Sequence, residues 1–132
     1  MTSSPRILVV DDHRDTADML IDIFNAKGCI ARSAYDGPEA IAAAAILHPQ
    51  IAFLDLGMPD MDGFIVAGAL REQFGPGICI VALTARTDAG TMSRVAGAGF
   101  NLHVAKPASA DALMAIVAEC VPDWPPATID PP

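Results

Sequence analysis

The sequence predicts an α/β protein built on one open sheet of parallel strands. Three short runs, ILVV at 7–10, IAFL at 51–54 and ICIVAL at 78–83, are apolar throughout. Strands covered by helices on both faces of a parallel sheet have such continuous apolar sequences, whereas half-exposed strands alternate apolar and polar residues. Helical patterns separate the runs, so the chain alternates between strand and helix five times and implies right-handed crossovers.

Two weaker runs complete the set of predicted strands, CIARSA at 29–34 and LHVA at 102–105, and we expect them nearer the sheet edges. The predicted helices cover 14–27, 36–47, 63–73, 89–98 and 109–120. Gly28 supplies a stop for the first helix. Asp36 can cap the second, with Pro38 at an early position and Glu39 three residues after the cap. Ser109 can cap the last.

The composition is that of one globular domain. The chain has 132 residues, of which 52% are hydrophobic and 18% are charged. We assign residues 1–120 to the folded domain. Residues 121–132 contain five of the eleven prolines and are expected to form an extended or disordered tail. Trp124 in this tail is a candidate for docking on the domain or on a partner.

Charge and cysteine content narrow the class of function. The net charge is −8 and the eight Lys and Arg residues are scattered, which argues against direct contact with nucleic acid. The apolar run near the N-terminus is too short for a signal peptide or a membrane span. Cys29, Cys79 and Cys120 lie in apolar segments, and we interpret them as reduced core thiols. These features favour a soluble cytoplasmic protein.

Polar side chains follow four of the predicted strands. In open α/β sheets, ligands bind outside the carboxyl ends of the strands, so these side chains should converge at one edge. They are Asp11 and Asp12 after the first strand, Asp55 after the third, Thr84 after the fourth, and Lys106 with Pro107 after the fifth.

The chemistry of this set favours a metal-assisted phosphoryl-transfer site. Three carboxylates in one place repel each other, and at least one would hold its proton unless a cation were present. Oxygen ligands without His or Cys favour Mg²⁺ or Mn²⁺ over zinc. Lys106 and the hydroxyl of Thr84 would then stabilise charge on phosphoryl oxygens.

The segment FLDLGMPDMDG at 53–63 has two other interpretations. As a calcium loop its best register places Met58 and Ala69 at the two anchoring ligand positions, so the match fails. As a phosphatase nucleophile motif, Asp55 follows a strand but Gly57 occupies the place of the second acid. We therefore interpret Asp62 as a helix cap and Asp60 as a turn residue.

The motifs VVDD, FLDLGMPDMDG, ALTA and HVAKP, in this order and spacing, resemble the receiver domain of two-component response regulators over about residues 5–120. The resemblance implies a flavodoxin-like, doubly wound sheet with strand order 2-1-3-4-5 and five helices. It also implies that Asp55 accepts a phosphoryl group from a phosphohistidine on a sensor histidine kinase or phosphotransfer protein. Asp12, Asp55 and the backbone carbonyl of Gly57 would bind Mg²⁺, with Asp11 acting mainly through water.

Further roles follow from the same resemblance. Thr84 would move to hydrogen-bond the phosphoryl group, Lys106 would neutralise another phosphoryl oxygen, and Pro107 would follow a cis peptide bond. His103 occupies the position of the usual aromatic switch residue, and the H-x-x-K-P ending resembles receivers of hybrid kinases and stand-alone receivers. A titrating His103 and an inert, hydrogen-bonded one are both open.

We expect a signalling domain rather than an enzyme that turns over a substrate. Phosphorylation would shift the loop after Thr84 and the helix at 89–98, which Gly90 and Gly97 weaken. Output would pass to an unknown downstream protein by direct contact. Arg86 would either affect how fast the aspartyl phosphate hydrolyses or be simply solvated, and Gly57 leaves the site open to water, which would favour faster hydrolysis. A scaffolding pseudo-receiver and a magnesium-dependent phosphatase with an Asp nucleophile are the alternatives.

Overall fold

The computed structural model describes residues 4–57, 63–86 and 88–122. In these residues five strands form one sheet. The strands are Arg6–Val10 (β1), Ile30–Ala34 (β2), Ile51–Asp55 (β3), Cys79–Thr84 (β4) and Leu102–Ala105 (β5). The helices are Arg14–Ala26 (α1), Gly37–Leu47 (α2), Gly63–Phe74 (α3), Ala89–Gly97 (α4) and Ala110–Cys120 (α5), with a 3₁₀ turn at Gly75–Gly77 (η1).

The sheet has the order β2-β1-β3-β4-β5, and every neighbouring pair is parallel. The predicted α/β class and the strand order implied by the resemblance are both confirmed. The weaker strands, β2 and β5, lie at the two edges as expected. Parallel pairing places the carboxyl ends of all five strands along the same side of the sheet.

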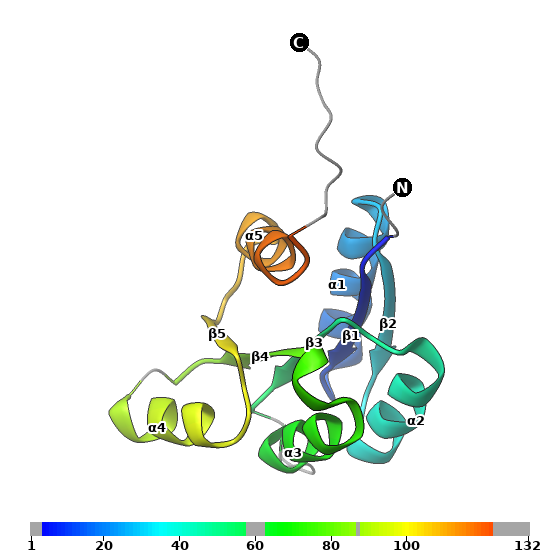
Figure 1. The fold of residues 1–132 in the computed structure, drawn as a ribbon. Helices are drawn as coiled ribbons and strands as arrows, with labels where there is room; N and C mark the ends of the chain where they lie inside the picture. Colours follow the sequence, from blue (N-terminus) through cyan, green and yellow to red (C-terminus); the bar gives the residue numbers. More distant parts are fainter. Residues whose placement is uncertain (1–3, 58–62, 87, 123–132) are drawn as a thin grey trace.

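Helices cover both faces of the sheet. Figure 1 shows α1 and α5 on one face and α2, α3 and α4 on the other. Along β3, Ala52 and Leu54 face the second group of helices, while Ile51 and Phe53 face the first. All four are fully buried. A strand covered on both faces has no polar side, which explains the continuous apolar runs of the sequence.

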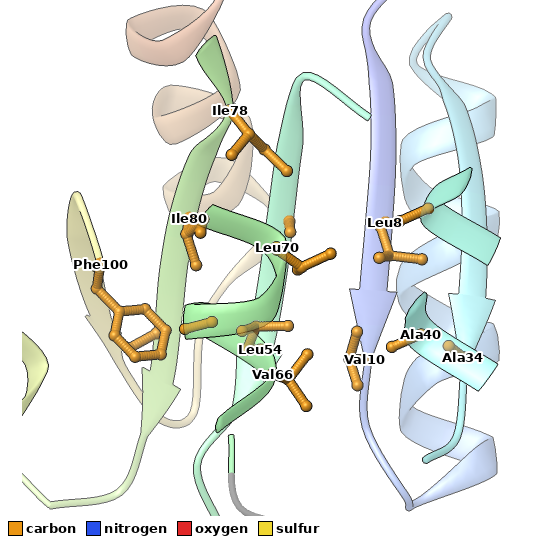
Figure 2. Packing of buried hydrophobic residues seen from close by; sticks show 14 of the residues in the cluster. Leu8, Val10, Ala34, Ala40, Leu54, Val66, Leu70, Ile78, Ile80 and Phe100 are labelled. Atoms are coloured by element: carbon orange, nitrogen blue, oxygen red, sulfur yellow. The ribbon is translucent and has the colours of Figure 1, made fainter. Parts of the chain in front are cut away.

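Two cores result, one on each face. On the side of α2, α3 and α4, Leu8 and Leu54 from the strands pack with Val66 and Leu70 from α3 (Figure 2). On the side of α1 and α5, the rings of Phe24 and Phe53 stack with their centroids 5.3 Å apart. Burying such side chains stabilises the fold by about 1.5 to 3 kcal/mol each.

Side-chain caps begin the helices close to the predicted positions. The Asp36 carboxylate accepts a hydrogen bond from the backbone N–H of Glu39 at 2.8 Å, and Ser109 Oγ accepts one from Ala112 N at 3.0 Å. The Glu39 side chain accepts from Tyr35 N rather than from the cap residue itself. Gly28, which follows α1, has a φ of 94° that other residues rarely adopt.

The prediction of three reduced cysteines is wrong for two of them. Cys79 at the start of β4 and Cys120 at the end of α5 form a disulfide, with their Cα atoms 6.2 Å apart. Cys29 is free and buried, as expected. The pairing follows from the packing of α5 against the sheet, which brings together two residues 41 positions apart. Sequence spacing alone does not reveal such a pair.

Some predictions fall outside the described residues. Asp60 and Asp62 lie within residues 58–62 and Trp124 lies within residues 123–132, so their predicted roles stay predictions. Among the described helices, none is long and apolar enough to cross a membrane.

Candidate functional site

The carboxyl ends of four strands bring the predicted polar residues together. Asp11 follows β1, Asp55 and Thr84 end β3 and β4, and Lys106 follows β5. The register of the sheet sets their depth, because Asp55 pairs with Leu83 and Thr84 pairs with Ala105. Side chains distant in the sequence therefore emerge at the same edge.

Three carboxylates form a cluster at this edge. One oxygen each from Asp11, Asp12 and Asp55 lies within 4.8 Å of the other two. Asp11 and Asp55 are only 1% and 5% exposed, whereas Asp12 is exposed. The cluster is therefore closed on the side of the sheet and open to solvent at Asp12.

The Asp11 carboxyl responds to this setting. Burial raises the pKa of Asp11 above its ordinary value, and the neighbouring Asp55 carboxylate raises it further. The backbone N–H of His13, which donates to Asp11 Oδ1 at 2.9 Å, and the Lys106 ammonium both oppose the rise. The expectation that one of three clustered carboxylates would tend to hold its proton agrees with this direction.

Asp55 is held by two donors. Lys106 Nζ lies 2.7 Å from Asp55 Oδ1, and the backbone N–H of Gly57 donates to the same oxygen at 2.8 Å. The Lys106 backbone N–H donates to Thr84 O at 2.9 Å, which fixes where the lysine leaves the sheet. The peptide bond between Lys106 and Pro107 is cis, as the resemblance implied.

Thr84 is buried at the end of β4 and is engaged locally. Its Oγ1 donates to the backbone carbonyl of Arg86 at 3.1 Å and accepts from the backbone N–H of Arg86 at 2.9 Å. Both hydrogen bonds fold residues 84–86 into a tight turn before α4. Any new partner for the Thr84 hydroxyl must therefore compete with this turn.

Two pockets meet at Asp55. One of about 340 Å³ opens between α3 and α4 and is lined by Asp55, Gly57, Thr84 and Lys106, with Arg86 at its mouth. The other, of about 580 Å³, lies between α1 and α5 and is mostly apolar. Asp55 can therefore be approached from solvent on either side of Lys106.

His103 lies apart from these pockets. Its side chain is exposed on β5 and lines a groove of about 450 Å³ with Met92, Val95 and Phe100. The groove runs between α4 and β5. The role of His103 as a switch residue stays a prediction.

Sequence reasoning missed Arg94 near the site and Arg71 at the opposite edge of the sheet, where β4 and β5 begin. Arg94 on α4 lines the pocket at Asp55, with its guanidinium over the Phe64 ring. Arg71 at the end of α3 reaches three backbone carbonyls and the side chain of Asn101. Neither arginine belongs to a local motif, because Arg94 meets Phe64 of another helix and Arg71 reaches segments that precede β4 and β5.

The donor set fits a hard divalent cation. All three clustered side chains offer oxygen atoms, and oxygen-only sets are preferred by Mg²⁺ and Mn²⁺. The Asp55 carboxylate also raises the pKa of Asp11, although burial is the larger cause, and a cation bound among the three carboxylates would offset their repulsion.

Comparison with known proteins decides the family. The family model of the response regulator receiver domain matches residues 7–118. The chain belongs to this family. Receiver domains act in two-component signalling, and the predicted family is confirmed.

Relatives and solved structures agree. The receiver domain is 38% identical over 118 residues to the DNA-binding response regulator MtrA of Mycolicibacterium smegmatis, covering 88% of this chain and 50% of that protein. It is 33% identical to an uncharacterized 14.6 kDa protein of Leptolyngbya boryana, covering 91% and 92% of the two chains. The chemotaxis protein CheY4 of Vibrio cholerae superposes with a TM-score of 0.84 at 25% identity, over 89% of this chain and 99% of that one. The chain thus spans about half the length of MtrA.

Proposed function

We propose that this receiver domain accepts a phosphoryl group on Asp55 from a phosphohistidine of a sensor histidine kinase or a histidine phosphotransfer protein. The observation that carries the proposal is the buried Asp55 carboxylate, held by Lys106 at 2.7 Å inside a cluster of three carboxylates. Asp55 has an open approach through the pocket between α3 and α4. No other described carboxylate combines burial, a cationic partner and this access.

The transfer forms one bond and breaks one. A carboxylate oxygen of Asp55 attacks phosphorus, and the P–N bond to the donor imidazole breaks with its electron pair remaining on nitrogen. Lys106 stays beside the Asp55 carboxyl and offsets charge on the transferred group. The Gly57 N–H orients the carboxyl by holding Oδ1. The product is an aspartyl phosphate.

Asp12, Asp55 and the Gly57 carbonyl would hold a magnesium ion, with Asp11 acting through water. When bound, the ion supplies positive charge that offsets the carboxylates and the phosphoryl oxygens. Lys106 supplies only one positive charge to three clustered carboxylates, so a second cation fits the electrostatics of the site.

The Thr84 turn offers a route from the site to the surface. A phosphoryl oxygen that accepts a hydrogen bond from Thr84 Oγ1 would displace Arg86 O as its acceptor. Arg86 is also paired with Asp88, which caps α4 through Thr91 N at 3.1 Å. α4 fully buries only Val95, with Met92 partly buried against the same core, so a change at this cap can shift the start of the helix.

Output then passes to a downstream protein through α4, β5 and α5. Contact with nucleic acid by this domain is not part of the proposal, because the net charge is −8. MtrA is a DNA-binding protein, but the receiver domain matches only half of it.

The test is labelling with acetyl phosphate, read by intact mass. We expect one phosphoryl group per chain with Mg²⁺, none with a chelator in excess, and none in Asp55→Asn. Steady hydrolysis without a bound phosphoryl group would indicate a phosphatase. No labelling by any donor, together with no response to Mg²⁺, would indicate a pseudo-receiver.

A further inference from the structure

The pocket between α3 and α4, which opens onto Asp55, is lined by an arginine that the proposed mechanism does not use. Arg94 lines this pocket together with Asp55, Thr84 and Lys106. Its guanidinium carbon lies 4.0 Å from the centroid of the Phe64 ring. Phe64 in turn meets Phe100 edge to face, with centroids 5.8 Å apart. The aromatic pair therefore gives the guanidinium a defined place on the wall between α3 and α4.

Arg94 differs from its neighbour Arg86 in whether a carboxylate pairs with its guanidinium. Arg86 Nε lies 3.2 Å from Asp88 Oδ1, so a carboxylate offsets its charge. Within residues 4–57, 63–86 and 88–122, the ion pairs are Arg86 with Asp88 and Lys106 with Asp55, and Arg94 is in neither. Arg94 thus presents a positive charge, resting on an aromatic face, to whatever enters the pocket.

The position of Arg94 relative to the reaction follows from burial. Asp55 is 5% exposed at the floor of the pocket, whereas Arg94 is exposed on its rim. In phosphoryl transfer the nucleophile and the leaving group lie roughly in line on opposite sides of phosphorus. With Asp55 at the floor, the leaving group departs toward the rim and solvent.

Resting on the proposed phosphorylation of Asp55, we propose that Arg94 selects among small phosphodonors by the charge of their leaving group. An acyl phosphate breaks its P–O bond and releases a carboxylate, which carries the electron pair as a negative charge. A phosphoramidate breaks its P–N bond and releases ammonia, which is neutral because the nitrogen is protonated before the bond breaks. A cation at the rim stabilises the first departure and not the second, so Arg94 favours acyl phosphates.

The experiment compares acetyl phosphate with phosphoramidate as donors to the full chain with saturating Mg²⁺. The initial rate of labelling is followed by intact mass at donor concentrations where the rate is linear in donor. The variants are Arg94→Gln, Arg94→Lys and Phe64→Leu. The matched control is Arg32→Gln, which removes an exposed positive charge from β2 at the far edge of the sheet.

We expect Arg94→Gln to lower the acetyl phosphate rate about threefold to fivefold, the effect of one partly solvated charge, with the phosphoramidate rate unchanged. The ratio of the acetyl phosphate rate to the phosphoramidate rate should stay close to the wild-type value in Arg94→Lys. It should fall in Phe64→Leu, as in Arg94→Gln. Added salt should move the wild-type ratio toward that of Arg94→Gln. The control Arg32→Gln should have the wild-type ratio.

The donor ratio separates the proposal from a structural role of Arg94, because a disturbed Asp55 site slows both donors. An equal loss with both donors, or an unchanged ratio while Asp55 is still labelled, would overturn the role of Arg94 and leave the proposed function intact. Absence of labelling on Asp55 in the wild-type protein would overturn both.

Discussion

Lys106 Nζ lies 2.7 Å from Asp55 Oδ1, and this ion pair joins residues 51 positions apart in the sequence. The lysine arrives from the end of an edge strand, and the aspartate from a central strand of the sheet. Their contact is the product of strand order and register rather than of any local motif. It also means that a metal ion bound as proposed would share the Asp55 carboxylate with the lysine.

This sharing predicts opposite effects of Lys106→Met on metal binding and on phosphoryl transfer. Removing the ammonium leaves the three carboxylates with less positive charge, so Mg²⁺ should bind about threefold to tenfold more tightly. Labelling by acetyl phosphate should slow about tenfold or more, because a group that offsets transferred charge is lost. Calorimetric titration with Mg²⁺ measures the first effect. Lys27→Met, at the exposed end of α1, is the control, and weaker Mg²⁺ binding in Lys106→Met would contradict the account.

The burial of Asp11 predicts an effect on folding stability whose size depends on pH. Its pKa is raised in the folded protein, chiefly by burial, so the charged form costs folding free energy. In metal-free protein this penalty is present above the folded-state pKa and is relieved as the pH falls through it. Asp11→Asn removes the charge and should stabilise the metal-free protein by about 1 kcal/mol at pH 7. Urea unfolding in a chelator measures the difference.

Once Mg²⁺ is added, the same variant should become less stable than the wild type. An ion that binds only the folded state stabilises it, and the variant, with one carboxylate fewer, should bind Mg²⁺ more weakly. The control Asp22→Asn, on the exposed face of α1, should match the wild type in stability both without metal and with Mg²⁺. Equal stability of wild type and Asp11→Asn at every pH without metal would show that burial of Asp11 carries no penalty.

The hydrogen bonds of Arg71, which lies away from the site, predict a loss of folding stability when its guanidinium is removed. Its guanidinium donates to the carbonyls of Gly75, Ile78 and Gly99 at 2.7 to 2.8 Å and to Asn101 Oδ1 at 2.5 Å. These bonds tie α3 to the segments that flank β4 and β5. Arg71→Met keeps the apolar stem and should lower the free energy of unfolding by about 2 to 3 kcal/mol, because several carbonyls lose a charged donor. Chemical denaturation beside Arg32→Met checks this, and a loss no larger than that of the control would refute it.

The cysteine pairing is open to direct counting. A thiol-reactive dye on the unfolded, unreduced protein should find one thiol, that of Cys29, and three after reduction. A disulfide that closes a loop of this length should stabilise the fold by about 2 to 4 kcal/mol. Reductant should therefore lower the denaturation midpoint of wild type but not that of Cys120→Ser. Three reactive thiols before reduction would favour the sequence interpretation over the structure.

Much of the fold was predictable because the sequence shows both continuous apolar runs and helix caps. The apolar runs that became β1, β3 and β4 are fully covered strands, and the caps at Asp36 and Ser109 mark helix starts. The parallel sheet then predicts that Asp11, Asp55 and Lys106 meet, since strand ends share an edge. Their positions follow from the sequence once the strand order is known.

What escaped sequence reasoning depends on contacts between elements. The disulfide needs the packing of α5 against the start of β4, and the position of Arg94 needs the packing of α4 beside Phe64. Both are long-range contacts without a spacing rule. The cis bond before Pro107 came from the family resemblance and not from the local sequence.

In the proposed function, Asp55 becomes phosphorylated and no other residue of the carboxylate cluster does. The most direct measurement traps the labelled protein by reducing the acyl phosphate with borohydride and maps the altered residue by peptide mass spectrometry. We predict a single altered position at Asp55, dependent on Mg²⁺ during labelling. An altered residue at Asp11 or Asp12 with Asp55 unchanged would contradict the account.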